Sequence, residues 1–99
     1  MQLTSVGEIF ARRDLYILND DEPDEEVVVL IGKPWPFSDL KDYYCPHQIT
    51  GGGEEGVRYA GEVDAVQALQ LAMGTIGAVL RLMNEKMNHK LRWLSDEDP

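Results

Sequence analysis

The segment from Asp64 to His89 is the only part of the chain with a clear helical period. Apolar residues recur there every three or four positions, as they do on one face of an α-helix. The members of this face are Val66, Leu69, Met73, Ile76, Leu80, Met83 and Met87. Asp64 stands where an N-cap is expected, with Gln67 three residues later. The pattern predicts one long helix over residues 64–88, and the rest of the chain must supply the surface on which it packs.

Four segments before the helix are typical of β-strands, because they are apolar or alternating and are bounded by turn-forming residues. They are residues 8–18, 26–32, 43–50 and 56–60. In the first segment Ile9, Ala11, Leu15 and Ile17 share one parity and are expected to face the core, whereas Arg13 interrupts them and predicts a bulge or an edge position. Short connections favour hairpins between consecutive strands. The expected fold is α+β with two layers: a four-stranded antiparallel meander and one long C-terminal helix packed on one face.

A chain of 99 residues is expected to form a single domain, with residues 1–7 and 95–99 loose. The segment 90–94 is either a short fifth strand or an extended tail whose Leu91 and Trp93 pack back. No secretory signal and no uninterrupted apolar run of about 18 residues is recognised. The single cysteine, Cys45, cannot form an internal disulfide. These features lead us to expect a cytoplasmic protein without a membrane partner.

The chain carries 18 acidic and 9 basic residues, for a formal net charge of −9. Nucleic acids and anionic lipids both attract positive surfaces, so neither is expected as a partner. A negative surface suits a basic protein partner, and it also keeps a small domain soluble.

Three stretches resemble a small bacterial family of unknown function. They read IGKPWP at residues 31–36, YCPHQITG at 44–51 and RYAGEVDAVQALQLA at 58–72. The resemblance extends from about Phe10 to Trp93 and supports the expected order of elements. It implies no catalytic residues and no function.

Cys45 and His47 lie two residues apart in a predicted strand, so a thiol and an imidazole would point to the same side. A catalytic pair would also need a group that orients the imidazole, and the sequence identifies none. The favoured interpretation is that both residues line the core or its rim. The two histidines and the cysteine show no metal-ligand spacing, so no metal and no cofactor is expected.

Four aromatic residues follow one another around the loop 33–44: Trp35, Phe37, Tyr43 and Tyr44. They form either a recognition surface or a cap over one open end of the sheet.

A second apolar row lies well round the predicted helix from the first, at Leu71, Thr75, Ala78 and Leu82. Together the two rows cover roughly two-thirds of the helix circumference, more than packing on a sheet requires. A homodimer that buries this second row is the favoured explanation, and coverage by Leu91 and Trp93 is the rival one. The expected function is therefore a non-enzymatic, self-associating protein-interaction domain. The alternative is a small-molecule-binding domain or minor enzyme, with its site between loop 33–44 and the sheet near Cys45 and His47.

Overall fold

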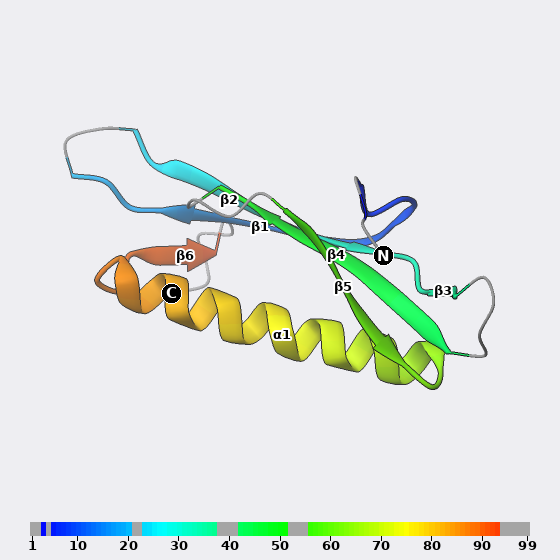
Figure 1. The fold of residues 1–99 in the computed structure, drawn as a ribbon. Helices are drawn as coiled ribbons and strands as arrows, with labels where there is room; N and C mark the ends of the chain where they lie inside the picture. Colours follow the sequence, from blue (N-terminus) through cyan, green and yellow to red (C-terminus); the bar gives the residue numbers. More distant parts are fainter. Residues whose placement is uncertain (1–2, 4, 21–22, 38–41, 52–55, 94–99) are drawn as a thin grey trace.

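The computed structural model describes residues 3, 5–20, 23–37, 42–51 and 56–93. It has two layers, an antiparallel sheet and one helix on one face of it (Figure 1). The elements in chain order are β1 (Ile9–Ile17), β2 (Glu25–Gly32), β3 (Trp35–Pro36), β4 (Tyr43–Thr50), β5 (Val57–Glu62), α1 (Ala65–Lys86) and β6 (Leu91–Trp93). The α+β class and the single long C-terminal helix are confirmed.

The described residues form a sheet of six strands, so the expectation of four was wrong. The pairs β1–β2, β2–β4 and β4–β5 form the expected antiparallel meander. The two further strands are short: β3 pairs with the start of β4, and β6 pairs with the end of β1. The short fifth strand considered for residues 90–94 is present as β6. The two residues of β3 have too little pattern to be recognised locally, and β3 forms because the longer strand β4 lies beside it.

A bulge was expected near Arg13. The structure has one in β1, three residues before Arg13. The register with β2 shifts between Ile9 and Ala11, where two residues of β1 stand against one of β2. An extra residue reverses the side to which the preceding side chains point. Ile9, expected in the core, is therefore 53% exposed, whereas Leu15 and Ile17 are buried.

Helix α1 begins and ends at local signals. The Asp64 carboxylate accepts a hydrogen bond of 2.8 Å from the Gln67 N–H, so the expected N-cap is confirmed. After the last turn, Asn88 and His89 adopt positive φ angles of 57° and 63°, which end the helix. The Asn84 side-chain oxygen then accepts a hydrogen bond of 3.1 Å from Leu91 N–H and fixes the return into β6.

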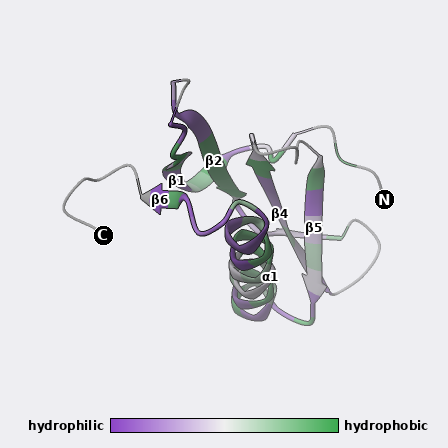
Figure 2. Ribbon diagram, turned by 90° about the vertical axis from the view of Figure 1, so that its left-hand side faces the viewer, coloured by the Kyte–Doolittle hydropathy of each residue, from purple (hydrophilic) through white to green (hydrophobic). Residues whose placement is uncertain are grey.

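The core consists of two clusters under α1. The smaller cluster packs Ala68 and Ala72 of the helix against Cys45 and Ala60 of β4 and β5. The larger one lies toward the helix C-terminus and is filled by long side chains. Its buried members are Leu15, Ile17, Val27, Val29, Ile49, Ile76 and Met83. Alanines let the first half of α1 lie close to β4 and β5, while β1 and β2 stand further off (Figure 2).

The buried face of α1 is rotated about the helix axis relative to the predicted one. Val66 and Met73 were expected to face the sheet, but they are 65% and 57% exposed. Ala68 and Ala72 are fully buried in their place. Alanine contributes little to an apolar pattern, yet its small size allows the closest approach to Cys45. Ile76, Met83, Leu69, Leu80 and Met87 contact the core as predicted.

Val6 belongs to the N-terminal segment that was expected to be loose, and its side chain is buried. The Val6 carbonyl oxygen lies directly against Gly32. A side chain at position 32 would collide with this oxygen and with the Pro46 ring. Gly32 is therefore required by this close approach. The other end expected to be loose, residues 95–99, lies outside the described residues.

Candidate functional site

The second apolar row of α1, the α1 row, consists of Leu71, Thr75, Ala78 and Leu82. Leu71 is 44% exposed and Leu82 is 58% exposed, while Thr75 and Ala78 between them are half-buried. Large apolar side chains on a protein surface are typical of an interaction site when they line up along one element, as they do in this row.

The α1 row lies on the β5 side of the helix. Thr75 lines a small cavity together with Gly56 and Arg58, at the start of β5. The C-terminal strand lies on the other side, because β6 pairs with β1 and Leu91 packs against the larger core cluster. Leu91 therefore does not cover the α1 row, and the Trp93 side chain lies outside the described structure.

Helix α1 is long and apolar enough to cross a membrane when judged by length and composition alone. Gln67, Gln70 and Arg81 interrupt the apolar residues of the helix, so the sequence contains no uninterrupted apolar run there. Core helices of soluble proteins pass the same test, so the finding is weak evidence for a membrane span. Only 22% of the most apolar 18-residue window of α1 is buried within the described part of the chain. Much of the apolar surface of the helix is therefore exposed.

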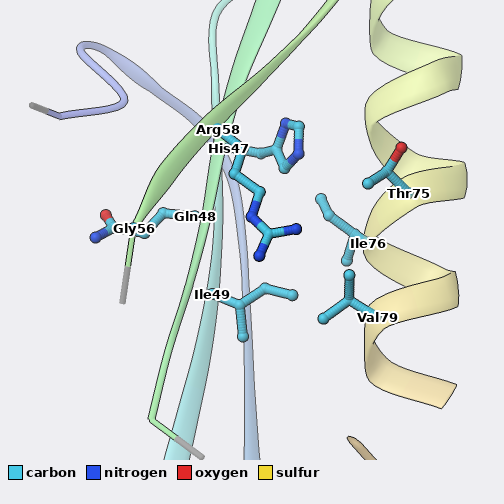
Figure 3. A pocket seen from close by; sticks show the side chains of 8 residues that line it. All are labelled: His47, Gln48, Ile49, Gly56, Arg58, Thr75, Ile76 and Val79. Atoms are coloured by element: carbon cyan, nitrogen blue, oxygen red, sulfur yellow. The ribbon is translucent and has the colours of Figure 1, made fainter. Parts of the chain in front are cut away.

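His47 lies on the face of β4 that looks toward α1, and it points toward Thr75 and Ile76 of the helix (Figure 3). Its side chain is 3% exposed. Nδ1 lies 3.2 Å from the Cys45 carbonyl oxygen, to which it donates in the neutral tautomer that this contact favours. Nε2 is then an acceptor, and it has no hydrogen-bond partner among the described residues.

Burial lowers the pKa of His47, because desolvation disfavours the charged imidazolium. The nearby Arg58 charge lowers the pKa further, while the hydrogen bond to Cys45 opposes both effects. The cavity beside the ring is about 10 Å³. The lowered pKa favours the neutral form of His47, and the cavity beside the ring has room for about one water molecule.

Cys45 is fully buried, and its thiol donates to the Gly32 carbonyl oxygen at 3.5 Å. Burial raises the pKa of the Cys45 thiol, which opposes formation of a nucleophilic thiolate. Among the described residues, no three histidine, cysteine or acidic side chains stand close enough to hold a metal ion. Among the described residues, Cys45 and His47 both lie buried between the sheet and α1.

The structure divides the four loop aromatics. Phe37 and Tyr44 lie on the sheet face opposite α1, with ring centroids 5.2 Å apart. Tyr43 packs on the helix side against the smaller core cluster. The Lys33 ammonium lies over the Trp35 ring, 5.2 Å from the ring centroid. Of the four, Phe37 and Tyr44 make a ring contact, and Trp35 stands opposite Tyr44 in the β3–β4 pair. Residues 38–41 of the loop lie outside the described structure.

Tyr59 completes this aromatic group and was missed in the sequence. Its ring lies edge-on to Phe37 at 6.2 Å and to Tyr44 at 6.3 Å. In the β4–β5 ladder Tyr59 stands opposite Pro46 and diagonal to Tyr44, a distance that aromatic side chains can span. The alternation of β5 alone could have placed Tyr59 on this face, but only the register shows which rings it meets.

Fold and surface together define a small two-layer α+β domain, in which the described residues leave an apolar helix row exposed beside the edge strand β5. The chain belongs to the family described as a domain of unknown function (DUF6968), whose model matches residues 11–99. No curated protein and no solved structure matched the chain. The family membership agrees with the resemblance found in the sequence and brings no activity with it.

Proposed function

We propose that this protein is a non-enzymatic, self-associating interaction domain that forms a twofold homodimer through α1 and β5. The observation that carries the proposal is the exposed α1 row, with Leu71 and Leu82 about half in contact with solvent. Burying apolar surface contributes roughly 25 cal/mol per Å², so a second copy that covers this row is stabilised by its burial. Twofold homodimers are the commonest soluble oligomers.

The edge of the neighbouring strand β5 also favours a dimer interface on this side of the molecule. Within the described structure β5 pairs only with β4, so its outer edge is open next to the α1 row. An open edge offers unpaired N–H and C=O groups that a second strand can bind. A dimer that joins two β5 edges would continue the sheet from one subunit into the other.

The sequence of β5 is self-complementary in an antiparallel pair centred on Ala60. Arg58 then stands opposite Glu62 of the other copy, and Tyr59 stands opposite Gly61. Opposite charges across strands stabilise a pair by roughly 0.2–1 kcal/mol. This charge pair occurs twice in a twofold dimer.

The helices also fit this arrangement. Helix α1 lies over β4 and β5, and neighbouring strands are ~4.8 Å apart. Two helices placed in this way on one continuous sheet would lie roughly 10 Å apart, close to the 8–10 Å of packed helices. Leu71 is near the centre of the contact, because Ala60 packs beside Ala68 and Ala72.

Light scattering on the purified protein tests the proposal. We expect a mass of twice 11.2 kDa for the wild-type chain, and a monomer for Leu71→Glu. Leu82→Glu should weaken the dimer less, because Leu82 is eleven residues or ~16 Å further along the helix. Gln70→Glu adds the same charge on an exposed position of the helix outside the row, and should leave the mass unchanged. A wild-type monomer at micromolar concentration, or equal behaviour of Leu71→Glu and Gln70→Glu, would overturn the proposal.

The net charge of −9 makes a basic protein the expected partner of the dimer. No described surface favours the alternative small-molecule site near Cys45 and His47, since both side chains are inside the fold.

A further inference from the structure

Strand β1 has an open edge beyond the end of β6. The short strand β6 pairs only with residues 15–17, at one end of β1 (Figure 1). Residues 11–14 pair with β2 on one side and with no described residue on the other. An open strand edge offers N–H and C=O groups that an extended chain can bind. A further strand can therefore be added to the sheet along the line of β6.

The hydrogen bonds between β1 and the chain around β6 show which groups point toward this edge. The Leu18 N–H donates to the Lys90 carbonyl oxygen at 2.9 Å. In an antiparallel pair such positions alternate with positions whose N–H and C=O point the other way. By this alternation the backbone N–H and C=O of Asp14 and Arg12 lie at the open edge. Their side chains face away from α1, because Leu15, of the opposite parity, is buried in the core.

A trough lies directly beside this edge, between β1 and the flank of α1 opposite the α1 row. It consists of two adjoining hollows of about 260 Å³ and 330 Å³. The first lies against residues 11–13 and has an apolar floor, formed by Val29, Ile31, Ile76 and Leu80. Exposed Met73 edges this hollow, and its flexible thioether can adapt to an occupant. The second hollow is more polar, so large apolar side chains belong in the first.

Leu91 shows how a side chain from the line of β6 packs. It stands opposite Ile17 in the β1–β6 pair, lines the second hollow and packs against the larger core cluster. A strand that continued β6 toward Ala11 would direct every second side chain to the same side, into the first hollow. Gly77 lines both hollows, and a Cβ built there would contact nothing within 4 Å, so this space is open.

We propose that the open edge of β1 binds an extended segment of a partner protein, antiparallel to β1, with a large apolar side chain at every second residue. Main-chain hydrogen bonds to Arg12 and Asp14 hold the segment, and the first hollow selects its apolar side chains. Neither contact requires a charged side chain. The site is independent of the dimer proposed above, because it lies on the other flank of α1.

The probe is a capped peptide, Lys-Thr-Leu-Thr-Leu-Thr-Lys, whose leucines can enter the trough while its threonines face away from α1. Titration of the full chain, followed by nuclear magnetic resonance, should show saturable binding with the largest amide shifts at Arg12 and Asp14. Replacing both leucines of the peptide by serine should weaken binding at least tenfold. Leu71→Glu, on the other flank of α1, should bind the peptide within twofold of wild type.

Methylation of the peptide's backbone nitrogens tests the main-chain bonds separately from the side chains. The threonines would stand opposite Arg12 and Asp14, so their N–H groups point toward β1, whereas the leucine N–H groups point away. N-methylation of two threonines should weaken binding at least tenfold. N-methylation of the two leucines adds the same number of methyl groups and should weaken binding less than threefold.

Gly77→Leu and Gly74→Leu form a matched pair of protein variants. Both replace a helix glycine whose Cβ has open space, so both should fold with α1 at least as stable as before. Gly77→Leu fills the trough and should weaken peptide binding at least tenfold. Gly74 is exposed and does not line the trough, so Gly74→Leu should bind within twofold of wild type.

Equal binding of the two N-methylated peptides, or equal binding by Gly77→Leu and Gly74→Leu, would overturn the proposal. No binding of the parent peptide would do the same. Two further results would give the edge to another occupant. A chain ending at residue 93 that binds the peptide at least tenfold tighter than the full chain would assign the edge to the chain's own residues 94–99. Conversion of a dimer into monomers by the peptide would assign it to a second copy.

Discussion

At position 47 the fold buries an imidazole whose Nε2 has no partner among the described residues. Burial and Arg58 lower the His47 pKa, so the native state binds its proton less readily than the unfolded chain does. Stability is therefore fully present above the unfolded pKa of about 6.5 and is lost as the pH falls through the lower native pKa. Urea unfolding followed from pH 7.5 to about 5.5 should show this loss, and His47→Gln should remove it. His89→Gln, at an exposed turn, is the control and should keep the pH dependence of the wild type. An unchanged slope in His47→Gln would contradict the assignment.

At the scale of the element, α1 depends on its first turn. The Asp64 carboxylate satisfies the Gln67 N–H at 2.8 Å, where the first helical N–H groups have no partner within the helix. Asp64→Ala should lower the free energy of unfolding by about 1 kcal/mol, whereas Asp64→Ser keeps an accepting oxygen and should lose much less. Chemical denaturation of both variants measures the difference. Equal stability of Asp64→Ala and the wild type would mean that packing on β4 and β5 alone holds the helix start.

At the scale of the whole molecule, the proposed dimer predicts a specific register between two β5 strands. Glu62→Arg would place an arginine opposite Arg58 of the other copy at two symmetry-related positions, and should shift the equilibrium toward monomer. The double variant Arg58→Glu with Glu62→Arg restores opposite charges and should restore the dimer. Light scattering and the concentration dependence of Tm both report this, because association stabilises the folded state by mass action. Dimers of equal strength in wild type and Glu62→Arg would exclude this register.

Several features of the fold were determined by the sequence alone, because they depend on neighbours along the chain. The helical period and the Asp64 cap defined α1 to within two residues at each end. Alternation and turn-forming residues located the four strands of the meander, and β4 was predicted at its observed bounds. Parity placed Cys45 and His47 together on the inner face, where both are buried.

Other features were decided only by the tertiary structure. The rotation of α1 depends on how closely it approaches Cys45, so Ala68 and Ala72 displaced the larger Val66 and Met73 from the core. The strands β3 and β6 exist because β4 and β1 offer them partners. A hollow lies between α1 and β1 because α1 packs on β4 and β5 and leaves its other flank open toward β1. In each case the cause is contact between segments distant in the sequence, and a local pattern carries no information about distances between such segments.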